Sequence, residues 1–132
     1  MNDAAAWYAS LIRPDFAPPA WVFGPVWTML YVVIAVSYGY VVWLAIRKRL
    51  AWRTVLPFAL NLLFNLAFTP LQFGLRSNAL AAVDIVLVLI TLVWALVAIR
   101  PHARWVALVN LPYLAWVMFA TVLQLSITWL NR

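Results

Sequence analysis

Amide and aromatic side chains recur along the second of the long apolar segments of this chain. Four of them follow the spacing i, i+4, i+7 and i+11, which places them on one helix face. They are Asn61, Asn65, Phe68 and Gln72. Amide groups inside a membrane avoid lipid and turn toward neighbouring helices or a cavity. Two interpretations therefore stay open: the amides hold helices together by hydrogen bonds, or they contact a ligand.

Aromatic residues are concentrated where the preceding apolar segment begins, in FAPPAWVFGPVWTMLY, residues 16–31. Phe23, Trp27 and Tyr31 recur at i, i+4 and i+8, so their rings lie roughly along one helix face. They form either an aromatic belt at the membrane interface or one wall of a binding site. Trp27 and Tyr31 lie one and two turns deeper than such a belt requires.

Asp84 is the one acid within an apolar segment. A carboxylate inside a membrane is costly and is by default a functional candidate. An acid close to a helix N-terminus is also stabilised by the helix dipole, so a purely structural role is the alternative.

The last apolar segment contributes a third group of side chains. Tyr113, Trp116 and Ala120 share a face at i, i+3 and i+7, and the small Ala120 leaves room beside the tryptophan. Pro112 is expected to bend this helix locally. Together with the amides, these residues outline an aromatic, amide-lined cavity that suits a flat, largely apolar ligand.

These residues form no recognisable catalytic or metal site. The sequence has no cysteine, and its one histidine, His102, has no second metal ligand nearby. The apolar segments contain no hydrolytic triad, carboxylate pair or phosphate-binding loop. We therefore expect no metal, no required cofactor and no nucleic-acid partner.

Composition sets the fold class. The 132 residues are 68% hydrophobic and 9% charged, whereas soluble domains have about 25% charged residues. Four apolar segments are long enough to span a bilayer, and we predict helices at about 21–46, 54–75, 78–99 and 105–129. Because the connections are short, neighbouring helices must be antiparallel. We expect one all-α membrane domain over residues 1–132, an antiparallel bundle of four transmembrane helices.

Basic residues predict the orientation of this bundle. The connections at residues 47–53 and 100–104 contain four and two of them, whereas the opposite side has Arg13, Arg76 and Arg132. Loops rich in lysine and arginine stay in the cytoplasm. We therefore expect both basic connections to be cytoplasmic.

The segments that carry these residues resemble the TspO/MBR family, the translocator proteins or tryptophan-rich sensory proteins. The resemblance runs in order through WYASLIRPDFAPPAWVFGPVWTMLY, NLLFNLAFTPLQFGL, AAVDIVLVL and LPYLAWVMFATVL. It implies a homodimeric protein of a membrane, here a bacterial cell membrane, that binds porphyrins, sterols and synthetic benzodiazepine-site ligands.

The resemblance also implies a ligand pocket under a lid formed by residues 1–20. Tyr8, Pro18 and Pro19 would belong to that lid. The walls would come from Trp27, Tyr31, Asn65, Phe68, Trp116 and Ala120. In some bacterial members, the tryptophans that match Trp27 and Trp116 are associated with light-dependent oxidative breakdown of protoporphyrin.

Two departures from the family pattern bear on these expectations. Family members have five spanning helices, and the helix before the WY…RP loop is absent here, so the chain either has four helices or begins downstream of the true start. The sterol motif of the animal members centres on a tyrosine before a basic residue, but this chain has Trp129 instead. We therefore expect no specific cholesterol binding.

The sequence thus predicts a membrane receptor or sensor for porphyrins and similar hydrophobic ligands. The alternatives are a light-dependent porphyrin-degrading enzyme, with Trp27 and Trp116 at its centre, a proton-coupled exporter that uses Asp84, and a structural protein without a ligand. A homodimer is expected because small residues let helices approach closely in lipid. The small residues concerned are Ala35 and Gly39 in the first segment and Ala81 and Ala82 in the third.

Overall fold

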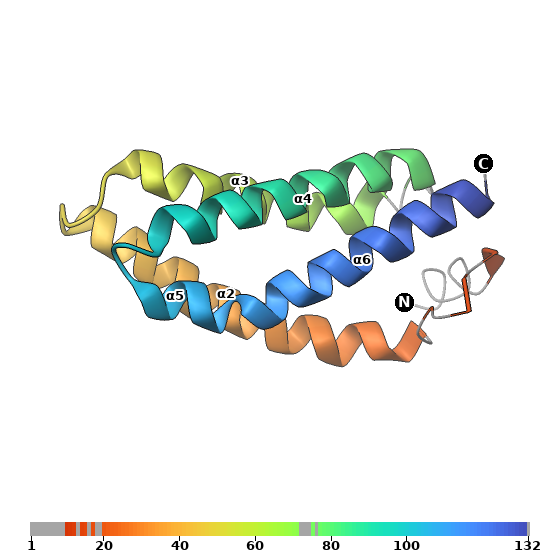
Figure 1. Cartoon of the computed structure of the whole chain (residues 1–132), viewed down its shortest axis with the longest axis horizontal. Helices are drawn as coiled ribbons and strands as arrows, with labels where there is room; N and C mark the ends of the chain where they lie inside the picture. Colours follow the sequence, from red (N-terminus) through yellow and green to blue (C-terminus); the bar gives the residue numbers. More distant parts are fainter. Residues whose placement is uncertain are drawn as a thin grey trace.

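A computed structural model describes residues 10–12, 14–15, 17, 20–71, 75 and 77–131, and over this part the chain is helical without strands. The elements, in order, are η1 (Ala20–Val22), α2 (Phe23–Ile46), α3 (Trp52–Thr69), α4 (Asn78–Ile99), α5 (Arg104–Val109) and α6 (Leu111–Leu130). Four long helices share one axis, with the α2–α3 and α4–α5 connections at one end and the start of α2 and the end of α6 at the other (Figure 1). The predicted all-α antiparallel bundle is confirmed.

Helix length and composition make this an integral, multi-pass membrane protein. α2, α4 and α6 are long and apolar enough to cross a bilayer, and Trp52–Phe68 is a shorter apolar helix. Such helices satisfy their own backbone hydrogen bonds, as a lipid environment requires.

Local sequence sets where α3 ends and α4 begins. Proline has no N–H to continue the helical ladder, and the α-helical pattern of α3 stops at Thr69, immediately before Pro70. A wider turn follows, in which the Leu75 N–H donates to the Pro70 carbonyl over 2.8 Å. The helix is therefore shorter than the predicted segment 54–75. α4 then starts at a side-chain cap, because the Ser77 Oγ atom accepts from the Leu80 N–H at 3.2 Å.

The predicted fourth helix, 105–129, is divided into α5 and α6. The break falls at Asn110, two residues before Pro112 in the first turn of α6. Pro112 cannot donate to the carbonyl four residues back, and this interrupts the ladder. The Asn110 side chain makes use of the break: its Nδ2 atom donates to the Val106 carbonyl at 2.8 Å and to the Ser37 Oγ atom at 3.0 Å. The break is thereby tied to α2.

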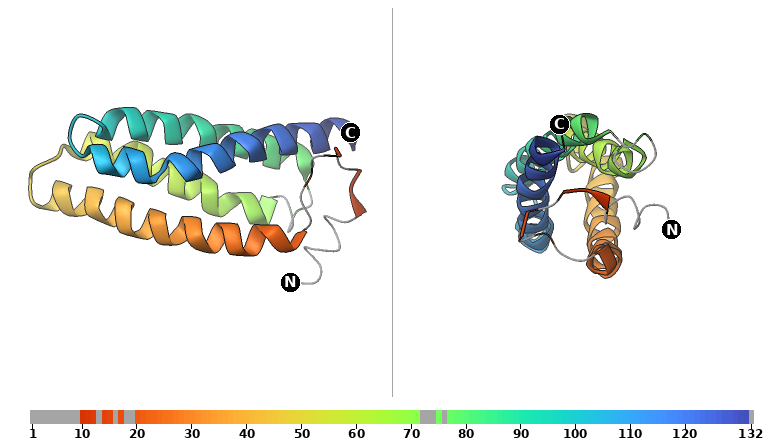
Figure 2. Two further views of the ribbon diagram at one scale, coloured as in Figure 1. Left: turned by 60° about the horizontal axis from the view of Figure 1, so that its bottom comes forward. Right: turned by 90° about the vertical axis from the view of Figure 1, so that its right-hand side faces the viewer.

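Packing is closest between α3 and α4 and between α4 and α6, while α2 contacts α3 and α5. The end view shows α2 and α6 standing apart at the end where α2 begins and α6 ends (Figure 2). Ala81 and Ala82, predicted as an association patch, are instead buried at 0% and 7% exposure. That part of the prediction is wrong, because α4 packs between two neighbouring helices.

A short stretch before α2 lies against the C-terminal end of α6. Leu11 is buried with Leu123 and Ile127 in a small apolar cluster. The Asn131 side chain holds the Ile12 backbone by two hydrogen bonds, accepting from its N–H at 3.1 Å and donating to its carbonyl at 2.8 Å. The side-chain amide thus pairs with a backbone amide and fixes this stretch across the end of the bundle.

Candidate functional site

The amide face of α3 is buried and enters hydrogen bonds between helices. The Asn65 Oδ1 atom accepts from the Tyr31 hydroxyl on α2 at 2.8 Å, and its Nδ2 atom donates to the Tyr113 hydroxyl on α6 at 2.7 Å. Asn65 is 4% exposed. This amide therefore joins three helices and uses both of its polar atoms within the protein.

Asn61, one turn earlier and fully buried, is the centre of the same network. Its Oδ1 atom accepts from the hydroxyls of Tyr38 at 2.6 Å and Tyr113 at 2.9 Å. Its Nδ2 atom donates to the Val88 carbonyl at 2.9 Å and to the Thr91 hydroxyl at 3.2 Å on α4. Side chains of α2, α3, α4 and α6 thus meet in one continuous polar network.

Sequence reasoning missed Tyr38 and Thr91 as members of this network. Tyr38 follows Tyr31 at i+7, a spacing that returns to nearly the same face of α2, so a signal was present. Thr91 had no such signal, because its position opposite Asn61 depends on how α3 and α4 pack.

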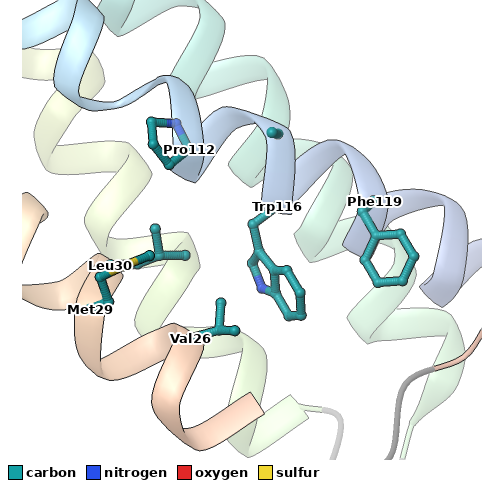
Figure 3. A pocket seen from close by; sticks show the side chains of 7 residues that line it. Val26, Met29, Leu30, Pro112, Trp116 and Phe119 are labelled. Atoms are coloured by element: carbon teal, nitrogen blue, oxygen red, sulfur yellow. The ribbon is translucent and has the colours of Figure 1, made fainter. Parts of the chain in front are cut away.

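A groove of about 520 Å³ lies between α2 and α6, where these helices diverge. This volume falls within the range typical of small-molecule sites, about 300–1,000 Å³. Its walls are apolar apart from one indole nitrogen. They consist of Val26, Met29 and Leu30 on α2 and Pro112, Ala115, Trp116 and Phe119 on α6 (Figure 3).

Trp116 is the one groove-lining residue with a polar side-chain atom. The Nε1 atom is buried and has no hydrogen-bond partner among the described residues. Figure 3 shows this nitrogen on the side of the ring that faces Leu30 and Val26, so the N–H points toward α2. Phe23 and Phe119 contact the ring, with centroid distances of 5.8 and 5.5 Å. Because a buried unpaired donor costs about 1–3 kcal/mol, an acceptor on a bound molecule would relieve that cost.

Trp27 lies next to this groove without lining it. Its ring contacts Tyr31 at 5.6 Å and Tyr113 at 6.4 Å between centroids. The two tryptophans singled out from the sequence therefore occupy different aromatic clusters, Trp27 against the polar network and Trp116 against the groove. The lining residue Val26 is the chain neighbour of Trp27, so the two clusters adjoin.

The other predicted site residues fall into three groups. Phe68 and Ala120 are partly buried and pack against the apolar core. Asp84 is 4% exposed, and its buried Oδ2 atom has no hydrogen-bond partner among the described residues. The remaining positions, Tyr8, Pro18, Pro19 and Gln72, lie outside the described residues.

Most of the groove lining was not anticipated from the sequence. Val26, Met29, Leu30 and Ala115 are ordinary apolar residues of membrane helices, and nothing in their types distinguishes a groove from a packed core. Pro112 was expected to bend its helix. Pro112 also lines a space large enough for a ligand, because α6 diverges from α2.

The sequence matches the model of the TspO/MBR family over residues 1–130. It is 35% identical to the tryptophan-rich protein TspO of Chlorobaculum tepidum over 130 residues, which cover 98% of this chain and 82% of that protein. Identity to the translocator protein of Homo sapiens is 38% over 130 residues, covering 93% of this chain and 73% of the human protein. Protein CrtK of Rhodobacter capsulatus is 36% identical over 128 residues, covering 96% and 79%.

Proposed function

This chain belongs to the TspO/MBR family, and we propose that it is a membrane receptor or sensor for porphyrins and similar hydrophobic ligands. The observation that supports the proposal most is the groove between α2 and α6, whose wall contains Trp116 with its buried, unpaired indole N–H. No resident cofactor is needed for this role, since the porphyrin is the ligand itself.

The chemistry of the groove fits a flat, conjugated molecule with a few polar groups. Offset or edge-to-face ring contacts with Trp116 and Phe119 contribute about 0.5–1.5 kcal/mol each beyond burial. A carboxylate or carbonyl oxygen at the edge of the ligand accepts from the Trp116 N–H. The open side of the groove carries Met29 and Ala115, which are exposed, so a ligand larger than the groove extends past them.

The polar network stabilises the two helices that form the groove. It includes Asn61, Asn65, Tyr31 and Tyr113. Their hydrogen bonds hold α2 and α6 to α3, and they thereby fix the spacing of the two walls. A direct contact of Asn65 with the ligand stays a prediction. It requires that the ligand take the place of Tyr31 or Tyr113 in a hydrogen bond.

Titration of the purified protein with protoporphyrin tests the proposal. We expect saturable quenching of tryptophan emission at one ligand per chain. Linear, non-saturating quenching would show that the porphyrin only partitions into the detergent. Illumination of the complex separates a receptor from a photo-oxidative enzyme, because only the enzyme converts the bound porphyrin to a bilin-like product with a new absorbance band.

A second candidate function, proton-coupled export of hydrophobic compounds, is favoured by Asp84. A buried carboxyl group on a membrane helix with an unpaired oxygen is the kind of group that carries protons in transporters. If the protein is an exporter, the wild type carries the compound across the membrane of vesicles and Asp84→Asn does not. If it is a receptor, neither chain gives efflux, so an efflux assay in vesicles distinguishes the two.

We also place the protein in the membrane with the connections at 47–53 and 100–104 in the cytoplasm, as the basic residues favour, and we propose a bacterial cell membrane. A homodimer is proposed through the outer face of α2. Ala35 and Gly39 are exposed there, and a Cβ atom built on Gly39 meets nothing within 4 Å. This face is open to the close approach of a second helix.

A further inference from the structure

One end of the bundle is strongly basic and has no acid of its own. The α2–α3 and α4–α5 connections meet at this end (Figure 1). Its exposed cations are Arg47, Lys48, Arg49, Arg53, Arg100 and Arg104. The acids of the chain are Asp3, Asp15 and Asp84, none of which belongs to either connection. A counter-charge at this end must therefore come from another molecule.

Two of these cations are brought onto one indole ring by the way α2 ends. The Lys48 N–H donates to the Ala45 carbonyl and the Arg49 N–H to the Leu44 carbonyl, at 3.0 and 2.9 Å. These bonds form a Schellman motif with Lys48 in the left-handed conformation, at φ 60°. The reversal carries Arg49 back toward the helix that it has just left.

Arg47 and Arg49 consequently lie over the same side chain, Trp43. Their guanidinium carbons are 5.7 and 6.0 Å from the ring centroid, which is within the range of cation–π interactions. A guanidinium group that stacks on a ring keeps the N–H donors, which lie in the plane of the guanidinium itself, free for an oxyanion. Two such groups on one ring provide a pair of donors for a phosphate.

An aromatic platform continues from this point to α5. Tyr40 stacks on Trp43 with a centroid distance of 5.7 Å and contacts Trp105 at 5.0 Å. Trp43 and Trp105 are exposed at 45% and 39%. Partly exposed tryptophan and tyrosine rings sit at the level of lipid headgroups, and Arg104 precedes Trp105 in the chain. The cations therefore lie at the depth where lipid phosphates are found.

We propose that Trp43, Arg47 and Arg49 form a binding site for the phosphate of an anionic phospholipid, with the Tyr40–Trp43–Trp105 platform against the upper part of its acyl chains. Arg53, Arg100 and Arg104 add long-range attraction to an anionic leaflet. Each lysine or arginine near an anionic bilayer contributes about fivefold in partition, and this contribution is absent in a neutral detergent micelle. The site is separate from the groove between α2 and α6, so this proposal does not depend on the proposed receptor function.

Lipid titration of the full chain in a neutral detergent, followed by native mass spectrometry, tests the site. The probes are dioleoylphosphatidylglycerol and dioleoylphosphatidylcholine. We expect the first phosphatidylglycerol to bind at least tenfold more tightly than phosphatidylcholine. The double variant Arg47→Gln, Arg49→Gln should lose most of this preference. Inorganic phosphate should not displace the lipid, and displacement at equal concentration would show a site for a free anion instead.

A matched double variant distinguishes a site from a diffuse potential. Arg53→Gln, Arg100→Gln removes the same charge from the same end without touching Trp43, and we expect it to keep most of the preference. Equal losses in the two double variants would overturn the proposal, as would a wild-type chain that binds both lipids alike.

A second double variant, with lysine at positions 47 and 49, keeps the proposal testable if the glutamine variant fails to fold. Arg47→Lys, Arg49→Lys keeps the positive charge at the helix C-terminus, where it favours the helix dipole, but lacks the planar guanidinium. We expect wild-type unfolding in detergent together with a clear loss of phosphatidylglycerol preference. An unchanged preference in this variant would contradict a guanidinium–phosphate site.

Discussion

Asn65 donates from its Nδ2 atom to the hydroxyl of Tyr113 over 2.7 Å, and this bond joins α3 to α6. The other polar atom of the same amide is taken by Tyr31 of α2. An amide that looks available to a ligand in the sequence is therefore engaged within the protein. The unpaired donor lies elsewhere, at the buried indole nitrogen of Trp116.

Different side chains of the hydrogen-bond network should contribute unequally to the free energy of unfolding. Asn61→Ala leaves the Tyr38 and Tyr113 hydroxyls without their acceptor and should lower the free energy of unfolding by about 2 kcal/mol. Tyr31→Phe removes one bond from a partly exposed group and should cost about 0.6 kcal/mol, the average for such bonds in membranes. Unfolding of the purified variants by titration with dodecyl sulfate gives both values. A larger loss in Tyr31→Phe would show that Asn61 is not the centre of the network.

The pairing of Asn131 with Ile12 predicts a local effect on dynamics. Asn131→Ala removes two hydrogen bonds to the Ile12 backbone, each worth about 0.5–1.5 kcal/mol. Amide hydrogen exchange in the peptide that contains Leu11 and Ile12 should become roughly tenfold faster, since about 1.4 kcal/mol is a factor of ten. Gln124→Ala, on the same helix but without a bond to this stretch, is the control. Equal acceleration in both variants would mean general loosening of α6.

Orientation is testable because the chain has no cysteine. Ala51→Cys places a single thiol in the exposed α2–α3 connection. If this connection is cytoplasmic, a membrane-impermeant thiol reagent should label the variant in broken cells and not in intact ones. Labelling in intact cells would reverse the assigned orientation.

Gly39→Leu tests the proposed dimer face of α2. A Cβ atom at this position meets no other part of the protein within 4 Å beyond its own stretch of helix, so the monomer should fold normally. Between two closely packed α2 helices it would cause a clash. We expect a detergent-corrected mass of a dimer for the wild type and of a monomer for the variant. A dimeric variant would place the interface on another face.

The sequence predicted the all-α membrane bundle and the buried amide face of α3, because these follow from composition and helical spacing. Two of the four predicted segments have other bounds, since α3 ends at Thr69 and the last segment is divided at Asn110. Asn61 and Asn65 were expected on one interior face and lie there, and Pro112 was expected to disturb its helix and lies directly after the break. Trp27 and Trp116 show what helical spacing alone cannot predict. Both were expected in the wall of one pocket, and only Trp116 lines the groove, because spacing within a helix cannot say which neighbours a ring meets. Ala81 and Ala82 were misplaced for the same reason.

The groove could not be derived from the sequence. It exists because α6 diverges from α2 after the break at Asn110, and its aliphatic walls have the composition of any membrane helix. Tyr38 was missed although its spacing from Tyr31 was visible, because no polar partner for it could be named before α2 and α3 were seen together.

Porphyrin affinity of Trp116→Phe tests the central claim most directly. Phenylalanine keeps an aromatic face in the groove and removes the N–H, so the change isolates the unpaired donor. We predict that protoporphyrin binds roughly two- to tenfold more weakly, as the loss of one hydrogen bond of about 0.5–1.5 kcal/mol implies. The control is Trp129→Phe, which changes a tryptophan of the same helix that is 63% exposed. This variant should bind protoporphyrin as tightly as the wild type. Unchanged affinity in Trp116→Phe, or equal weakening in both variants, would contradict ligand binding in the groove between α2 and α6.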